Sequence, residues 1–221
     1  MPLHDLTIRT IAEYLRDSTF SLINLQRLNT RFYQLMMMFI KNMSLDRAMT
    51  NYVCNNKPYG WQNVYSMCFI RRNDLANLSP FVYLHEIYLY GCDNLKDVSP
   101  IRKAKTIVIN DCRGIRDVSH LGGVKYLSIC MCPDLTDVSA LGGVHELKLS
   151  WCHNLENVAA LRTVKKLWLD YCDRIEDVTA LGTVKELTIS NCNKIKNVNA
   201  LKTVKKLYIV NCCYVQNIKN F

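Results

Sequence analysis

The chain has 221 residues, of which 49% are hydrophobic and 21% are charged, and its formal net charge is +9. This composition indicates a folded protein with a substantial core and excludes an intrinsically disordered chain. No apolar run approaches the roughly 20 residues that a membrane-spanning helix needs, and the first ten residues lack the pattern of a secretory signal. We therefore expect an intracellular protein, in the cytoplasm or nucleus and not in a membrane, whose eleven cysteines are free thiols.

Residues 1–60 show a helical spacing of apolar side chains. These side chains recur at intervals of three, four and seven positions between Leu3 and Leu35. We expect a small helical domain over residues 1–45, followed by a linker or N-terminal cap over residues 46–61. In one interpretation these helices only cover the first of the repeats that follow.

A second interpretation comes from the residues of this segment. Leu3 to Leu15, followed by "SLINLQRLNTRFYQL" (Ser21 to Leu35), resembles an F-box, although His4 stands where that family has proline. The matching residues are Leu3, Ile8, Ile11, Tyr14, Leu15, Leu25, Leu28 and Phe32. The resemblance implies a Skp-type adaptor of a cullin ubiquitin ligase as one partner. It implies that Leu3, Ile8, Ile11, Leu15, Leu25 and Leu28 bind this adaptor.

From about residue 62 to residue 221 the sequence repeats every 20 residues, eight times. Leu147 and Leu149 alternate with polar residues, which predicts a short strand with these leucines facing inward. Apolar residues then follow at every third position, a spacing typical of turns or a short 3₁₀ helix. The slot after each strand holds cysteine in the copies from the second on, at Cys92, Cys112, Cys132, Cys152, Cys172, Cys192 and Cys212. We expect these cysteines to be packing residues of the scaffold.

The repeat resembles the leucine-rich repeat, L-x-x-L-x-L-x-x-N/C-x-L. Val144, Leu147, Leu149, Cys152 and Leu155 show it, with one extra residue before Leu155. The resemblance implies an α/β repeat solenoid, right-handed, with a concave parallel β-sheet and short turns or 3₁₀ pieces on the convex side. The chain thus resembles F-box proteins with leucine-rich repeats, whose repeats hold the substrate.

One column of the repeat is Asp or Asn in every copy. Such short acceptor side chains bond nearby backbone N–H groups in turns, and we expect that role here. A ladder of metal ligands is a poor alternative because several members are Asn, so we expect no metal and no cofactor. The members are Asn77, Asp97, Asp117, Asp137, Asn157, Asp177, Asn197 and Asn217.

The outward-facing strand positions vary between copies and are rich in aromatic residues. Exposed Trp and Tyr clusters are frequent anchors of protein interfaces, although aromatics also simply suit strands. We predict that a protein target binds the concave face. The predicted contact residues are Tyr88, Tyr90, Tyr126, Met131, Lys148, Trp151, Lys166, Trp168, Asp170, Tyr171 and Tyr208.

A row of lysines lies one position before these strands. Such a row can meet phosphates or an acidic protein, but we interpret it as a solvated edge that discourages aggregation, and we do not expect nucleic acid as a partner. The row consists of Lys105, Lys125, Lys165, Lys185 and Lys205, with His85 and His145 in the same slot.

The sequence carries no nucleotide-binding loop, nucleophile elbow or zinc motif, so we expect no enzyme. The first hypothesis is a substrate-recognition adaptor of an SCF-type ubiquitin ligase. The alternatives are a stand-alone repeat scaffold and, ranked below it, a protein that binds nucleic acid along the lysine row.

Overall fold

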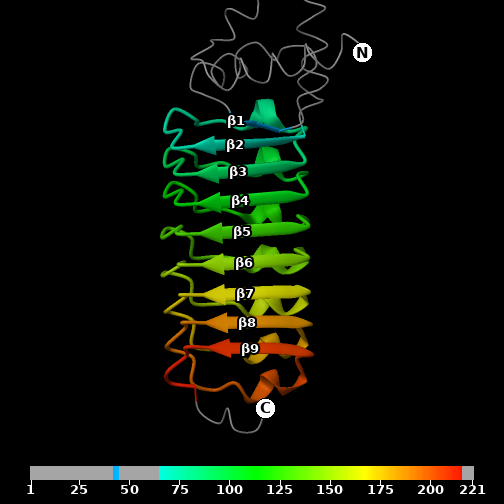
Figure 1. The fold of residues 1–221 in the computed structure, drawn as a ribbon, viewed down its shortest axis with the longest axis vertical. Coiled ribbons are helices and arrows are strands. Elements are labelled where there is room, and N and C mark those ends of the chain that lie inside the picture. The colour runs from blue at the N-terminus through cyan, green and yellow to red at the C-terminus, as the bar shows by residue number, and fades with distance from the viewer. Residues whose placement is uncertain (1–41, 45–64, 216–221) are drawn as a thin grey trace, which may run out of the picture.

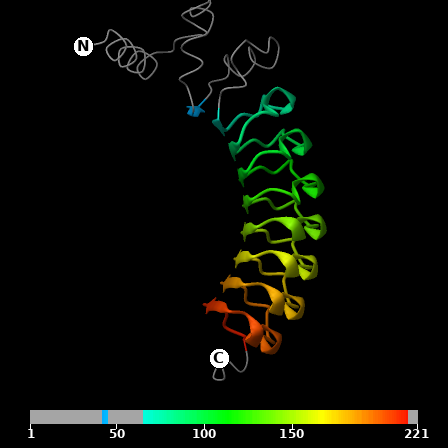
Figure 2. The same ribbon diagram turned by 90° about the vertical axis from the view of Figure 1, so that its right-hand side faces the viewer.

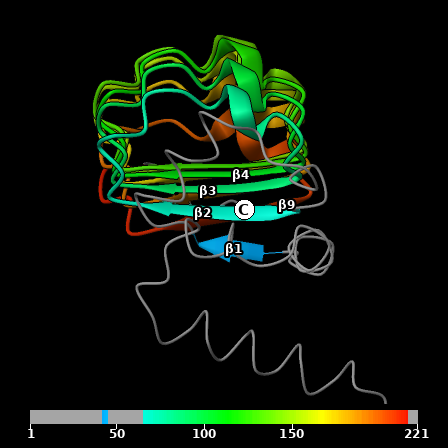
Figure 3. The same ribbon diagram turned by 90° about the horizontal axis from the view of Figure 1, so that it is seen from above.

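The computed structural model describes residues 42–44 and 65–215. Nine parallel strands form one sheet in which each strand pairs with the next along the chain (Figure 1). Short 3₁₀ helices form the second layer, behind the sheet (Figure 3). The helical segment predicted for residues 1–45 lies outside the described residues except for residues 42–44, and the linker or cap predicted for residues 46–61 lies outside them entirely. The residues predicted to bind the adaptor, Leu3, Ile8, Ile11, Leu15, Leu25 and Leu28, also lie outside them.

All nine strands point in the same direction. They are β1 (Asn42–Ser44), β2 (Ser66–Ile70), β3 (Glu86–Tyr90), β4 (Thr106–Asn110), β5 (Tyr126–Cys130), β6 (Glu146–Ser150), β7 (Lys166–Asp170), β8 (Glu186–Ser190) and β9 (Lys206–Val210). From β2 to β9 each residue pairs with the residue 20 positions later, as Leu149 does with Leu169. The 20-residue period predicted from the sequence is thereby confirmed.

A 3₁₀ helix precedes each of the strands β3 to β9. These helices are η2 (Ser79–Phe81), η3 (Ser99–Ile101), η4 (Ser119–Leu121), η5 (Ser139–Gly143), η6 (Ala159–Thr163), η7 (Thr179–Thr183) and η8 (Asn199–Thr203). The strands line the inner side of a gentle curve and the 3₁₀ helices line its outer side (Figure 2). The fold is a leucine-rich-repeat solenoid, as predicted. Within the described part, no helix is long and apolar enough to cross a membrane.

Strand β1 was not anticipated by the sequence analysis. It extends the sheet by pairing Asn42 with Ser66 and Ser44 with Cys68 of β2. Residues 42–44 do not show the 20-residue repeat pattern, so the sequence did not predict that they pair with β2.

The core is a continuous stack of side chains between the two layers. Leu147, Leu149 and Leu155 are fully buried, and the equivalent residues of neighbouring copies lie above and below them. Because one repeat has no other surface on which to bury these side chains, each copy depends on its neighbours. Burial of one such leucine stabilises the fold by about 1.5–3 kcal/mol relative to an exposed side chain.

The Asp/Asn column closes the turn before each 3₁₀ helix. Asp137 accepts a hydrogen bond from the backbone N–H of Ser139 through Oδ1, at 2.8 Å. Six further copies make the same contact, at Asn77, Asp97, Asp117, Asn157, Asp177 and Asn197. The predicted structural role is confirmed for these seven residues, and Asn217 lies outside the described ones.

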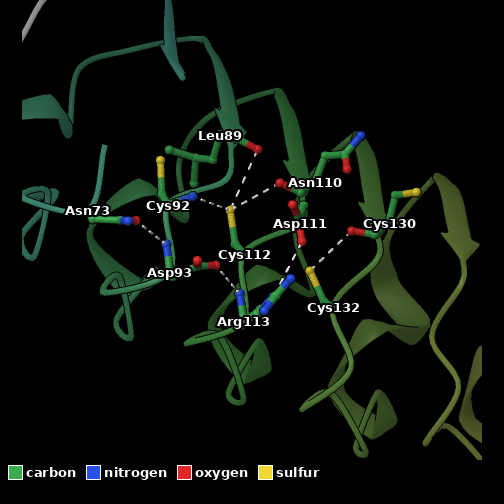
Figure 4. A network of polar contacts seen from close by, with 10 residues as sticks. All are labelled: Asn73, Leu89, Cys92, Asp93, Asn110, Asp111, Cys112, Arg113, Cys130 and Cys132. Atoms are coloured by element: carbon green, nitrogen blue, oxygen red, sulfur yellow. Dashed lines mark hydrogen bonds and ion pairs between the residues drawn. The ribbon is translucent and has the colours of Figure 1, made fainter. Parts of the chain in front are cut away.

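The cysteine column is a second ladder, inside the turn that follows each strand. Cys112 Sγ donates to the carbonyl oxygens of Leu89, at 3.7 Å, and Asn110, at 3.4 Å (Figure 4). Burial raises the pKa of Cys132 to about 11 and that of Cys152 to about 12, so these thiols stay protonated and act as donors. The cysteines of the described residues are free. Their predicted role as packing residues is confirmed.

Candidate functional site

The residue directly after each strand adopts a left-handed backbone conformation. Trp151 has φ 55° and its N–H donates to the carbonyl oxygen of Asp170 in the next copy, at 2.9 Å. We call this set the strand-end column. Its members are Arg71, Gly91, Asp111, Met131, Trp151, Tyr171, Asn191 and Asn211, with φ between 49° and 61°.

Left-handed backbone favours Gly, Asn and Asp, because a side chain crowds the carbonyl oxygen that follows it. Gly91, Asp111, Asn191 and Asn211 follow this preference. Arg71 and the three consecutive copies with Met131, Trp151 and Tyr171 do not. The sequence analysis missed this conformation, and the four favoured residues in one slot are the signal that reveals it. A residue of this size accepts a strain of about 1–3 kcal/mol in such a position.

The aromatic members of the strand-end column form a stacked pair. The rings of Trp151 and Tyr171 lie 4.0 Å apart between centroids with an angle of 14°, and His153 meets the indole edge-on at 5.7 Å. Trp151 is 40% exposed and the neighbouring Met131 is 45% exposed. A large part of their apolar surface therefore faces solvent, and neither residue belongs to the buried core.

Two predicted residues from the strands themselves adjoin this pair. Lys148 lies at the centre of β6 and pairs in register with Trp168 at the centre of β7. Lys148 is exposed and Trp168 is half-buried. We call Met131, Lys148, Trp151, Trp168 and Tyr171 the aromatic patch.

Three other charges on the predicted face are satisfied within the molecule. Lys166 Nζ lies 3.1 Å from Glu146 Oε1. Asp170 Oδ1 accepts hydrogen bonds from Ser190 Oγ at 2.6 Å and from Asn191 Nδ2 at 2.9 Å. We therefore interpret Lys166 and Asp170 as residues that hold neighbouring strands together, with their charged groups already engaged within the molecule.

Lys148 differs from these residues because none of the described residues forms an ion pair with its ammonium group. Beside it, the buried Ser150 Oγ has no hydrogen-bond partner among the described residues. A cation and a hydroxyl group without partners among the described residues thus lie on β6, just before Trp151 of the stacked aromatic pair.

The remaining predicted contact residues lie away from the patch. Tyr88 and Tyr90 lie on β3, four strands and about 19 Å from Trp168, and the hydroxyl of Tyr88 donates to Glu86 at 3.3 Å. Tyr126 opens β5, and Tyr208, 58% exposed, lies on β9. The structure therefore brings together part of the predicted set, between β5 and β7.

Metal-ligating side chains do not gather in the described part of the chain, which holds no group of three or more His, Cys, Asp or Glu residues able to bind an ion. His153 instead contacts Asp173, with Nδ1 3.3 Å from Oδ2. The described side chains around the aromatic patch are thus aromatic, cationic and hydroxyl groups.

Known proteins offer only distant comparisons. No protein-family model matches the chain, and no curated protein does. Among solved structures, an internalin (InlF) from Listeria monocytogenes is 15% identical, with a TM-score of 0.47, over 80% of this chain and 68% of its own. The functional domain of InlJ from the same organism, described as including a cysteine ladder, is 13% identical, with a TM-score of 0.39. That match covers 84% of this chain, which spans 56% of the InlJ chain.

Proposed function

We propose that the chain is a protein-binding module whose partner docks on the aromatic patch. The observation that carries this proposal is the stack of the exposed Trp151 on the half-buried Tyr171, in backbone positions that disfavour large side chains. Because this aromatic pair adopts a strained backbone conformation and is not part of the buried core, we infer that it serves to bind a partner. Trp and Tyr of this kind supply most of the binding energy in many protein interfaces.

The chemistry of the patch describes the partner segment. Apolar or aromatic side chains of the partner pack against Trp151, Tyr171 and Met131, and a carboxylate pairs with Lys148. The half-buried Trp168 beside Lys148 shields that pair from water, which strengthens it. This mixture of apolar and single-charge contacts is typical of a protein surface.

Site-specific photo-crosslinking tests the proposal. We replace Tyr171 with benzoylphenylalanine in the full chain, irradiate it in an extract of the cells that make the protein, and identify the adducts by mass spectrometry. The matched control places the same group at Glu156, an exposed turn residue on the way to η6. We expect a defined protein adduct at position 171 that Trp151→Asn removes. The same adducts at both positions, or none at position 171, would contradict the proposal.

A finer hypothesis concerns residues 1–45, which lie almost entirely outside the described residues. If they form an F-box, the module is the substrate receptor of an SCF-type ubiquitin ligase, and the aromatic patch holds the substrate. Co-purification with a Skp-type adaptor that Leu15→Asp abolishes would support this role. No association at micromolar concentration would leave the alternative, a scaffold whose N-terminal residues 1–61 only cap the repeats.

A further inference from the structure

A row of unpaired lysines runs along one side of the sheet, away from the aromatic patch. Each lysine is exposed and directly precedes a strand. In the described structure none of their ammonium groups forms a hydrogen bond or an ion pair. The lysine row consists of Lys105, Lys125, Lys165, Lys185 and Lys205.

Backbone hydrogen bonds hold this row in register. The carbonyl oxygen of Lys105 accepts from Tyr126 N–H at 2.9 Å, and that of Lys165 accepts from Glu186 N–H at 3.0 Å. Neighbouring rungs are therefore about 4.8 Å apart, the spacing of strands in a sheet. From Lys105 to Lys205 the row is about 24 Å long on that spacing.

The column of residues one position after the lysine row differs from it, because its lysines form ion pairs with glutamates of neighbouring copies. There Lys166 pairs with Glu146 at 3.1 Å, and Lys206 pairs with Glu186 at 2.9 Å. From Glu146 to Lys206, acidic and basic residues alternate from copy to copy in that column. In the lysine row, only His145 interrupts residues of one sign, and adjacent like charges repel.

The surrounding segments increase this charge. The five-residue stretches that end each 3₁₀ turn, from residues 81–85 to residues 201–205, contain nine Lys or Arg and no Asp or Glu. Four of the nine flank the row, at Arg102, Lys103, Arg162 and Lys202. Elsewhere in the described residues the acids outnumber the bases, 15 to 11. Within the described residues, the excess of positive charge is therefore concentrated on this basic edge, defined by the lysine row and its four flanking residues.

Protection against aggregation does not account for this arrangement. Lysines that block strand addition lie on the outermost strands, where backbone groups are unpaired. Four of the five lysines precede the inner strands β4, β5, β7 and β8, which are paired on both sides, and only Lys205 precedes the outermost strand β9. Our interpretation of the row as a protective edge therefore suits Lys205 and leaves the other four lysines without that role.

We propose that the basic edge binds the phosphate backbone of a nucleic acid without reading its bases. Nine cations along about 24 Å give one charge per about 2.7 Å, between the 3.4 Å of one nucleic-acid strand and the 1.7 Å of a duplex. A surface of uniform sign matches a ligand of uniform sign, whereas the mixed charges of the concave face match a protein. No aromatic column accompanies the lysines in the described structure, so contacts with the backbone dominate.

Salt dependence provides the first test. Fluorescence anisotropy of the full chain with a labelled 20-nucleotide oligothymidylate, and with a 20-base-pair duplex, is measured between 50 and 200 mM salt. If each row lysine neutralises one phosphate, log K for the single strand falls with log salt at a slope of about −3.5. This slope corresponds to a loss of about 100-fold in affinity across that range. Binding of neither probe at 50 mM salt would overturn the proposal.

Two triple variants with equal changes of net charge provide the second test. Lys165→Gln/Lys185→Gln/Lys205→Gln removes three of the five lysines in the row. We expect the slope of log K against log salt for the single strand to become shallower by about 2. The control, Arg174→Gln/Lys194→Gln/Lys196→Gln, removes three exposed charges from the turns beyond the strands, and we expect it to keep the slope. Circular dichroism melting curves verify that both variants fold.

Three outcomes of these experiments would overturn the proposal. The first is an equal loss of affinity in both triple variants, which would indicate a general effect of net charge. The second is competition by a 20-residue polyglutamate as effective as that by unlabelled oligothymidylate, which would indicate an acidic protein as the partner. The third is loss of nucleic-acid binding in Trp151→Asn, which would place the site on the aromatic patch.

Discussion

Trp151 and Cys152 are neighbours in the chain but belong to regions under opposite constraints. Cys152 is fully buried, its Sγ contacts the carbonyl oxygens of Ile129 and Ser150, and its slot is occupied by cysteine in seven copies. Trp151 is exposed, and its slot holds seven different residue types among eight copies. The inner ladders thus maintain the solenoid, and the strand-end column is free to serve recognition.

The largest effect that distinguishes the two regions is expected in the inward leucines. Leu149→Ala leaves a cavity between two copies, and we expect the free energy of unfolding to fall by about 2–5 kcal/mol. Urea unfolding followed by circular dichroism measures this change. A loss below 1 kcal/mol would mean that the stack tolerates cavities and that the inner ladder is less constrained than described.

A smaller effect is expected from acid, through the Asp/Asn column. Hydrogen bonds from the Ser99 hydroxyl and its backbone N–H lower the pKa of Asp97, and Thr179 does the same for Asp177. Because the folded pKa lies below the unfolded value of about 3.9, the stabilisation is present above that pH and is lost as pH falls through the folded pKa. We expect the urea midpoint to be flat from pH 7 to 5 and to fall below about pH 4.

The chain itself supplies the control for this acid effect. Asn157 and Asn197 make the same backbone contact without a titrating group. The double variant Asp97→Asn/Asp177→Asn is therefore expected to fold at neutral pH and to lose less stability in acid than the parent chain. An acid response identical to that of the parent would exclude these carboxylates as its source.

The smallest effect concerns thiol reactivity. Cys213 is exposed, whereas Cys152 is buried with its pKa raised to about 12. In the native chain, Cys213→Ser is expected to remove one fast-reacting equivalent towards a disulfide reagent, and Cys152→Ser none. Fast reaction of Cys152 would show that the turn after β6 opens readily.

Much of the scaffold is predictable because each structural position occurs in eight copies, whose shared residue types indicate its role. The strands, the 3₁₀ turns and the roles of Cys152 and Asp137 follow from residue types shared at intervals of 20. The left-handed slot was missed because Trp151 and Tyr171 hide the preference that Gly91 and Asn191 reveal. The concentration of charge on the basic edge was missed because each 20-residue repeat passes through both the basic edge and the more acidic opposite side. Positive and negative charges therefore cancel when they are counted along a continuous stretch of sequence.

The central claim is that the aromatic patch binds a protein partner and does not hold the fold together. Trp151→Asn tests it most directly, since asparagine already occupies this slot at Asn191 and Asn211. With the partner identified by crosslinking, we predict that its Kd rises at least about 30-fold, equivalent to about 2 kcal/mol, while the free energy of unfolding stays the same or rises because the backbone strain at this position is relieved. An unchanged Kd, or a loss of stability as large as the loss of binding energy, would contradict the account.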